Sequence, residues 1–474
     1  TRFYPSNMGA NKRGIFMFIG RTDELKKLAH FYRTDIQSAA LVYGRRRVGK
    51  SELLKRFLQG YETAALYYEC KRTSEMNNVE SLAALVAEKY HYPPLAFTGM
   101  EALLDFLFQK AQEDKTLLVL DEYTYLQDSV QGLDSILQSL LDKYAGKSRM
   151  KLILCGSFVD AMKSLLLSQN PLYGRIDLTL HVKPMDYYES AKFYPEFSLE
   201  DKVRLYSVFG GVPYYNRLID GSCSVRENII ALIASTGARL ENEIALYLSA
   251  ELSKFVNANE VFEALSRGFS RYGDILSQSH VSSSPALNDV LNKLMLMELV
   301  QKETPINEPL NRKCAGYFIR DNMSIFYYRY IFRFASQMRI MEPNAFYDRY
   351  IADDFEQQYV PKRFEDICRQ YLIRQNRCGA LEEPFDAIGK YSYDLPKAHK
   401  NGEFDIVTHD ACGYAFYEAK FRKSPVTRAV MEAEIRQVRE TGLDCYRYGF
   451  FSSAGFDDAA RADVVLYDLK DLYA

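Results

Sequence analysis

The sequence has no excess of either charge, and this limits what its bulk electrostatics can indicate. Its 474 residues carry 60 Lys and Arg against 62 Asp and Glu, which gives a formal net charge of −2. A balance this close to zero does not indicate nucleic-acid binding by the chain as a whole. Any such surface therefore has to be a local patch.

Cysteine and histidine are too scattered to suggest a metal site. The eight cysteines contain no CxxC pair, and no histidine stands at metal-ligand spacing from them. Cys155 lies in the apolar run LILC and is expected to be a buried thiol. This cysteine usage is typical of a protein of the reducing cytosol.

Long hydrophobic runs are also missing. No apolar run approaches the ~18 residues that span a bilayer, and no signal peptide opens the chain. Residues 1–16 are polar and unpatterned, and the chain does not begin with Met, so Met17 is a candidate start after an extension or tag-like segment. We expect a cytoplasmic protein with no membrane partner.

The first half of the chain alternates short apolar runs with longer segments of helical spacing. Strands alternating with helices imply right-handed crossovers and a parallel sheet covered on both faces. The fold class predicted here is α/β. The candidate strands are residues 39–44, 64–70, 116–122, 151–157 and 177–184.

The rest of the chain changes pattern several times, as expected for a length that suggests about three domains. Helical spacing is followed by three short helices and two strands, the order of a winged helix-turn-helix, and then by a second α/β unit. The predicted parts are an extension (1–16), a core (17–185), a helical segment (186–250), a winged helix (251–335), a connector (336–363) and a C-terminal domain (364–474).

A phosphate-binding loop follows the first apolar strand and precedes a helix former. Its glycines let several backbone N–H groups point at one anion, and the helix start adds its positive dipole. The motif GxxxxGK[ST] predicts that Lys50 reaches the β- and γ-phosphates of ATP and that Ser51 ligates Mg²⁺. The matching residues, with the adjoining Glu52, are Gly44, Arg45, Arg46, Arg47, Val48, Gly49, Lys50 and Ser51. The three arginines either face solvent or contact DNA or another subunit.

Two adjacent acids end the buried strand LLVLDE about seventy residues later. Asp121 is expected to hold the Mg²⁺ shell, and Glu122 to polarise the attacking water. Side chains alternate along a strand, so the two acids cannot point the same way if the strand stays extended.

Three further residues are candidates for the nucleotide site. Ser157 ends the strand LILCGS and either senses the γ-phosphate or caps the following helix. Arg175, in PLYGR, either neutralises charge on the γ-phosphate or forms a surface salt bridge. Arg21, in FIGR, precedes a helix, and its expected place near the adenine is what the resemblance to the ATPase family named next implies.

Read in order, FIGR, GRRRVGKS, LLVLDE, LILCGS, PLYGR and GGVP resemble the archaeal-type ATPase family within the AAA+/STAND group of P-loop NTPases. The resemblance implies a sheet of order 5-1-4-3-2, ATP as the nucleotide, and a helical lid that brings Gly211 and Pro213 close to it. It also implies a winged helix and a C-terminal domain related to restriction endonucleases.

The C-terminal segments GEFDIV and YAFYEAK match the D-xn-E-x-K arrangement of PD-(D/E)xK nucleases. Alternation along the strand puts Glu418 and Lys420 on one face, and pairing with the preceding strand brings Asp405 alongside. Two carboxylates would then bind Mg²⁺ while Lys420 activates water. Glu365 matches an acidic position on the preceding helix of such nucleases. Acid-x-Lys on a strand is also a common surface ion pair.

The candidate recognition helix, residues 282–298, buries Leu287, Val290, Leu291 and Leu294 and offers little basic charge on its other face. DNA contact and a structural role both stay open. The sequence therefore predicts an ATP-binding and ATP-hydrolysing switch with a nuclease-like effector acting on DNA. The alternative is a signalling or scaffold ATPase whose C-terminal domain binds protein partners and does not cut. Whether the chain forms a homo-oligomer stays open.

Overall fold

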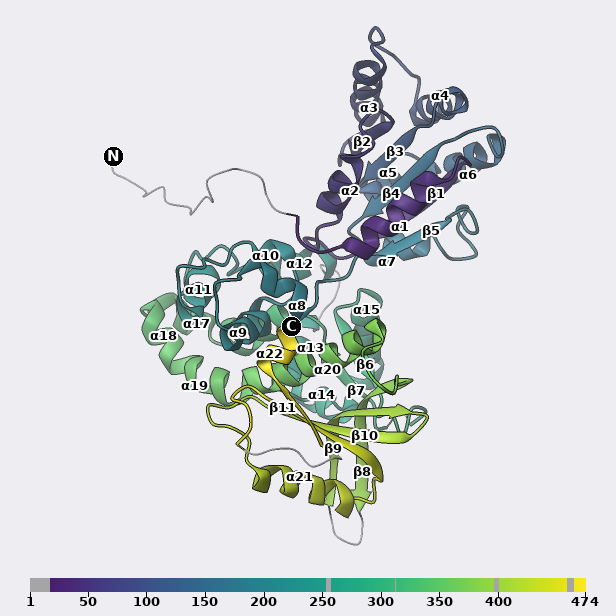
Figure 1. Cartoon of the computed structure of the whole chain (residues 1–474). Coiled ribbons are helices and arrows are strands. Elements are labelled where there is room, and N and C mark those ends of the chain that lie inside the picture. The colour runs from purple at the N-terminus through teal and green to yellow at the C-terminus, as the bar shows by residue number, and fades with distance from the viewer. Residues whose placement is uncertain (1–17, 253–256, 312, 396–399, 458–463) are drawn as a thin grey trace. The chain divides into compact units, whose positions relative to one another are not determined.

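The computed structural model describes residues 18–252, 257–311, 313–395, 400–457 and 464–474. The predicted extension (1–16) and candidate start (Met17) lie outside these residues. The chain forms two compact units, traced in Figure 1: one runs to Pro184 and includes Val212–Tyr214, and the other holds Met185–Gly211 and Tyr215–Ala474.

A five-stranded parallel sheet forms the centre of the first unit. Its order is β2-β3-β4-β1-β5, which confirms the predicted order 5-1-4-3-2. This order places the phosphate-binding loop after β1 near the two acids at the end of β3. Four strands fall within the predicted segments and β1 begins one residue earlier than predicted: β1 (Ser38–Tyr43), β2 (Ala65–Glu69), β3 (Leu117–Asp121), β4 (Lys151–Gly156) and β5 (Leu178–His181).

Two apolar cores cover the two faces of this sheet. Leu118 and Leu120 of β3 face one core, and Leu117 and Val119 face the other. Strands buried on both faces read as continuous apolar runs, which explains LLVL in the sequence. α1 (Thr22–Arg33) and α2 (Lys50–Leu58) cover one face. The other face is covered by α3 (Glu75–Tyr90), α4 (Met100–Glu113), α5 (Tyr123–Ser129), α6 (Leu133–Lys143) and α7 (Val159–Ser164).

The second unit opens with a helical segment that ends at a double glycine. α9 (Leu199–Phe209) stops at Gly210, whose φ of 59° is a left-handed conformation that favours glycine. A Cβ on Gly211 would lie 1.7 Å from the Met185 carbonyl oxygen, so only glycine fits there. The other helices of this segment are α8 (Tyr187–Ser190), α10 (Pro213–Asn216), α11 (Val225–Leu232) and α12 (Glu243–Leu252).

Three helices and a two-stranded antiparallel sheet follow in the predicted order. They are α13 (Ala258–Ser266), α14 (Tyr272–Gln278), α15 (Ser284–Leu296), β6 (Val300–Glu303) and β7 (Gly316–Ile319). The α15 residues that the sequence assigns to the core, Leu287, Val290, Leu291 and Leu294, are all buried. The wing loop is the segment between β6 and β7.

The aromatic stretch after β7 and the predicted connector are both helical. Phe326, Tyr328 and Tyr330 are buried, which confirms the prediction that these rings form core rather than a base-stacking surface. The helical elements here are α16 (Asn322–Phe326), η2 (Tyr327–Phe332), α17 (Ala335–Ile340), α18 (Pro343–Tyr350), α19 (Ala352–Asp354) and η3 (Phe355–Tyr359).

A mixed five-stranded sheet of order β12-β11-β10-β9-β8 ends the chain. The two predicted strands are β9 (Lys400–Asp410) and β10 (Gly413–Lys420), paired antiparallel, while β10 and β11 (Cys445–Ser452) run parallel. α20 (Val360–Cys378) and α21 (Arg428–Glu440) accompany the sheet. Three elements of this unit were not predicted from the sequence: β8 (Ala387–Leu395), β12 (Val464–Asp468) and α22 (Leu469–Tyr473).

Candidate functional site

The phosphate-binding loop connects β1 to α2 at the carboxyl end of the parallel sheet. Gly49 is the N-cap of α2 with a φ of 91°, and a Cβ on Gly44 would lie 2.2 Å from the Val182 carbonyl oxygen. The two glycines are therefore required by backbone conformation and by close packing respectively. The resulting turn leaves the N–H groups at the start of α2 available to an anion.

The Lys50 amine is held inside the loop. It is 5% exposed and donates to the carbonyl oxygens of Gly44 (2.8 Å) and Arg45 (3.1 Å) and to the Ser157 hydroxyl (2.9 Å). Burial lowers the pKa of Lys50, and the charges of Glu122 and Asp121 partly oppose this effect. A phosphate in the loop would supply the negative charge that this buried ammonium lacks.

Ser51 and Asp121 meet as the motif predicts. The Ser51 hydroxyl donates to Asp121 Oδ2 at 2.7 Å, and the Tyr67 hydroxyl donates to the same oxygen. Burial alone would raise the pKa of Asp121, but hydrogen bonds from Cys155, Ser51 and Tyr67 outweigh burial and lower it. A hydroxyl and an ionised carboxylate within contact of each other are hard oxygen donors that fit Mg²⁺.

Glu122 turns toward the same loop because the backbone leaves the extended conformation at this residue. Its φ of 53° is left-handed, so the alternation of an extended strand no longer separates it from Asp121. Oε1 accepts a hydrogen bond from Ser157 at 2.8 Å, whereas buried Oε2 has no hydrogen-bond partner among the described residues. An unpaired buried carboxylate oxygen is costly, which points to a ligand or a water as its partner.

Ser157 joins the two charged groups of the loop. Its hydroxyl accepts from Lys50 and donates to Glu122. The alternative role as a helix cap is wrong, since Phe158 is the N-cap of α7 and no side chain caps that helix.

Ser157→Ala should lower kcat by about tenfold or more while ATP affinity changes less. The substitution removes two hydrogen bonds to charged groups, each worth about 1.5–3 kcal/mol, and leaves Glu122 without its orienting donor. Steady-state ATP hydrolysis and equilibrium ATP binding measure the two effects separately. Ser164→Ala, at an exposed serine of α7, is the matched control, and equal kcat values in both variants would remove Ser157 from the site.

Arg21 has a different environment from the one predicted. It is 6% exposed and donates to the carbonyl oxygens of Val48 (3.0 Å) and Lys183 (2.7 Å). Its guanidinium therefore links the phosphate loop at Val48 to Lys183, in the segment that follows β5. A role at the adenine stays a prediction that these contacts do not support.

Two of the loop arginines pack on aromatic rings. Arg46 lies 5.0 Å from the ring centre of Phe158, and Arg47 lies 4.1 Å from that of Tyr214. Pro213 is also close, with Cγ 3.9 Å from where a Cβ of Gly49 would lie. Pro213 therefore lies beside the phosphate loop, and the closeness of Gly211 to the nucleotide stays a prediction.

Arg175 forms the surface salt bridge that the sequence left as an alternative. Its Nε and Nη2 donate to the two carboxylate oxygens of Asp142 at 2.9 and 2.8 Å. Its remaining hydrogen bonds go to the Pro171 and Tyr173 carbonyl oxygens, and within the described residues none goes to the phosphate loop. The catalytic role predicted for Arg175 would require this bidentate pair to break.

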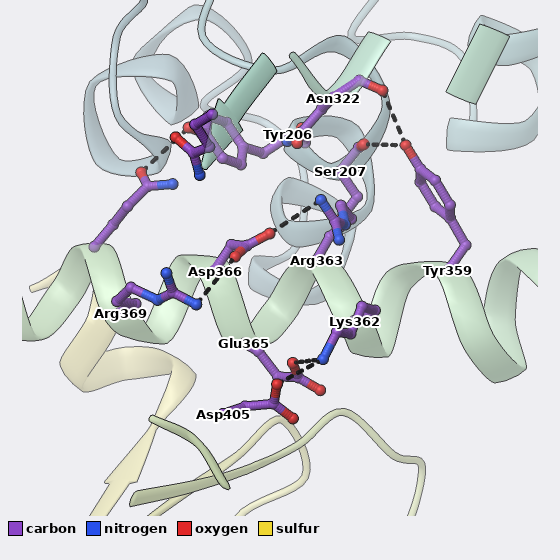
Figure 2. Close-up of polar contacts among 12 residues, drawn as sticks. Tyr206, Ser207, Asn322, Tyr359, Lys362, Arg363, Glu365, Asp366, Arg369 and Asp405 are labelled. Carbon is purple, nitrogen blue, oxygen red and sulfur yellow. Dashed lines mark hydrogen bonds and ion pairs between the residues drawn. The ribbon is translucent and has the colours of Figure 1, made fainter. Parts of the chain in front are cut away.

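The predicted nuclease residues gather in the second unit, each paired with a lysine. Lys362 donates to Asp405 (2.8 Å) and forms an ion pair with Glu365 (2.6 Å), as Figure 2 shows. Lys390 also reaches Asp405 at 3.3 Å, and Lys420 pairs with Glu418 at 2.7 Å. We call Glu365, Asp405, Glu418 and these three lysines the carboxylate cluster.

Burial and lysine charges act against each other in this cluster. Burial would raise the pKa of Asp405, but Lys362 and Lys390 outweigh it and lower it. Burial raises the pKa of Glu365 to about 7, with Lys362 opposing and Asp405 reinforcing the shift. Burial also raises the pKa of Glu418 against the charge of Lys420.

The carboxylate cluster does not fit a divalent metal in this arrangement. Its carboxylates are suitable oxygen donors, but a lysine ammonium group contacts one oxygen of each of them. Among the described residues, no three His, Cys, Asp or Glu side chains are placed to hold a metal ion together. The predicted metal-ligand roles of Glu365, Asp405 and Glu418 therefore have no support from the geometry.

The wing loop is docked on β8, the edge strand of the C-terminal sheet. The Ile306 N–H donates to the Lys390 carbonyl oxygen, and the Asn307 side chain bonds both the N–H and the C=O of Ser392. On the outer face of α15, Lys293 pairs with Asp289 at 2.6 Å. These contacts favour the structural role for the winged helix over DNA contact.

Sequence reasoning missed Tyr67, Lys362 and Lys390. The alternation of β2 places Tyr67 on the side opposite Tyr68, but its partner Asp121 is 54 residues away. Lys362 precedes Glu365 by three residues, a spacing that predicts a helical ion pair. The ion pair of Lys362 with Glu365 could therefore have been predicted from the sequence. The contact of Lys362 with Asp405 could not, because the two residues are 43 positions apart.

Comparisons with known proteins agree with the first site. Residues 18–217 match a family described as an ATPase domain predominantly from Archaea, and residues 327–438 match archaeal and bacterial proteins of unknown function. An uncharacterised protein of Methanocaldococcus jannaschii is 26% identical over 461 residues, 96% of this chain and 100% of that protein. An uncharacterised ATP-binding protein of the same organism is 44% identical over 46 residues, 10% of this chain and 78% of that protein.

A solved structure of similar fold comes from an archaeal ATPase. The Walker-type ATPase of Pyrococcus abyssi aligns with a TM-score of 0.51 and 18% identity, covering 66% of this chain and 96% of that one. No helix within the described residues is long and apolar enough to cross a membrane.

Proposed function

We propose that this chain, whose residues 18–217 match an ATPase domain found predominantly in archaea, works as an ATP-driven switch for its own C-terminal domain. ATP binding and hydrolysis follow from the ATPase domain of residues 18–217. The observation that carries the switch is the hydroxyl of Ser157, which joins Lys50 to Glu122. Through this hydroxyl, a shift of the Lys50 amine on phosphate binding would move Glu122, the proposed general base.

The residues of the loop have separate tasks in this proposal. The backbone N–H groups at the start of α2 and the Lys50 amine bind the phosphates of ATP. Ser51 and Asp121 would hold Mg²⁺, which supplies charge neutralisation at the phosphates. Glu122 Oε2 accepts a proton from the attacking water, and Ser157 keeps Oε1 oriented.

The switch would reach the C-terminal domain through α9. The chain leaves α9 at Gly210 and enters the loop region at Val212–Tyr214, where Tyr214 stacks on Arg47. At its other side α9 is bonded to η3, where the Tyr359 hydroxyl donates to the Ser207 carbonyl oxygen and Glu356 pairs with Arg204. It is also bonded to α20, which follows η3 directly, because the Tyr206 hydroxyl donates to Gln370. A change at the nucleotide that moves the GGVP segment would therefore move α9 and α20 together.

For the effector we propose a nuclease-like domain that acts on DNA through Asp405, Glu418 and Lys420. Its support is the spacing of the three residues on β9 and β10, whose antiparallel pairing ends one residue short of Asp405 and Glu418. The second candidate, a domain that binds protein partners without cutting, is favoured by the lysine pairing of every predicted ligand.

A cleavage assay decides between the two candidates. The full chain is incubated with linear and branched DNA, ATP and Mg²⁺ or Mn²⁺, beside Asp405→Ala and Lys420→Ala. A nuclease should lose cleavage in both variants, since one removes a carboxylate and the other the positive charge that activates water. Cleavage that persists in both would clear these residues, and no cleavage with any metal would favour the binding domain.

A further inference from the structure

Lys362 occupies the position between two carboxylates that come from different elements. Its amine lies 2.6 Å from Glu365 on the same helix and 2.8 Å from Asp405 on β9. A cation shared by these two oxygens is the arrangement expected of a metal ion in the nuclease-like domain. Here a side chain of the protein supplies that cation.

A second lysine completes the neutralisation. Lys390 contacts Asp405 at 3.3 Å and Glu403 at 3.0 Å, and Arg271 of the winged helix pairs with Glu403 as well. Three acids and three bases, Glu365, Asp405, Glu403, Lys362, Lys390 and Arg271, therefore balance in one connected group. A divalent ion entering between Glu365 and Asp405 would lie within a few ångströms of the Lys362 ammonium and be repelled by it.

α20 holds Lys362 in this place, and α20 is fixed to α9. The Tyr359 hydroxyl, one turn before Lys362, donates to the Ser207 carbonyl oxygen of α9 and to the Asn322 carbonyl oxygen, at 2.9 and 3.0 Å. The Tyr206 hydroxyl of α9 donates to Gln370, which lies on α20 after Lys362. Figure 2 shows that Tyr359, the last residue of η3 before α20, points toward α9 while Lys362 of α20 points away toward Asp405. Asp405 belongs to the sheet, so a shift of α20 would separate the pair.

We propose that Lys362 is a built-in cation that closes the Glu365–Asp405 pair to divalent metal until α20 moves with α9. This inference rests on the proposed nuclease-like effector and names its regulation. It also accounts for a nuclease-like arrangement of residues in a cluster that does not fit a metal.

Lys362→Met in the full chain, without nucleotide, tests the closure. Mn²⁺ binding is measured by electron paramagnetic resonance for the wild type, for this variant, for Lys362→Met with Asp405→Asn, and for Lys293→Met as the surface control. We expect Lys362→Met to bind Mn²⁺ at least about tenfold more tightly than the wild type, since a cation at contact distance is removed. The double variant and the control should return to the wild-type level.

A thermal melt of Lys362→Met with and without Mn²⁺ tests metal binding even if this variant is less stable than the wild type. Removing Lys362 leaves two carboxylates facing each other, so Tm should fall without metal and recover with Mn²⁺. Lys362→Gln provides a second, polar replacement with the same expectation.

The outcomes separate the closure from the nuclease. Mn²⁺ binding to the nucleotide-free wild type that disappears in Asp405→Asn would overturn the closure, as would the absence of any gain in Lys362→Met and Lys362→Gln. Gained Mn²⁺ binding without DNA cleavage would support the closure and refute the nuclease. Gained binding with cleavage would support both.

Discussion

Replacing Lys50 with alanine should reduce ATP affinity by about a hundredfold or more and bring hydrolysis below detection. The Lys50 amine is a buried charged donor inside the loop, and hydrogen bonds to charged groups contribute about 1.5–3 kcal/mol each. Lys50 makes three such contacts with the loop and Ser157. In the ATP complex the Lys50 amine would donate to the phosphates instead, so its loss weakens ATP binding as well as hydrolysis.

Equilibrium binding of a fluorescent ATP analogue and steady-state hydrolysis measure the two quantities. Lys26→Ala is a suitable control because this lysine lies on α1 with a side chain that is 75% exposed. A melting curve shows whether Lys50→Ala keeps its fold after losing a buried group. Unchanged hydrolysis by a folded Lys50→Ala protein would refute the assignment of the loop.

Glu122→Gln should separate hydrolysis from binding. The amide oxygen of glutamine can still accept from Ser157, so the geometry of the loop is kept, but the side chain no longer takes a proton. General-base catalysis contributes about 10²- to 10⁴-fold, and we expect the rate of hydrolysis to fall by about a hundredfold or more. ATP affinity should stay within a few-fold of the wild type.

Single-turnover hydrolysis of prebound ATP measures this rate without the contribution of product release. Glu62→Gln, at an exposed glutamate between α2 and β2, controls for the loss of one negative charge. A normal single-turnover rate in Glu122→Gln would remove its role as the base. A rate lost together with ATP affinity would instead assign Glu122 to binding.

The first unit could be predicted well because its signals are local. Each buried parallel strand is a short apolar run, and the strand–loop–helix order around Lys50 is contained in one stretch of sequence. The left-handed backbone of Glu122 could not be predicted, since a non-glycine residue adopts it only when its surroundings favour it. It is this turn that brings the acid to Ser157.

The second unit was harder because its contacts are distant in sequence. β8 reads AIGKYSYDL, where glycine, lysine and aspartate interrupt the apolar alternation, so the strand gives a weak signal. Asp405, Glu418 and Lys420 lie on the two strands predicted for them, but the lysines that contact Asp405 were not predicted. Lys362 and Lys390 come from other elements, and a motif says nothing about which side chains fill the space between its members.

The docked wing loop has a consequence for the association of this protein with other chains. An edge strand with free N–H and C=O groups can pair with a strand of a second molecule, which leads to aggregation. On β8 the outward carbonyl of Lys390 and both backbone groups of Ser392 are already bonded to the loop. The wing therefore protects this edge from strand addition, and detaching it would expose a surface that can recruit another polypeptide.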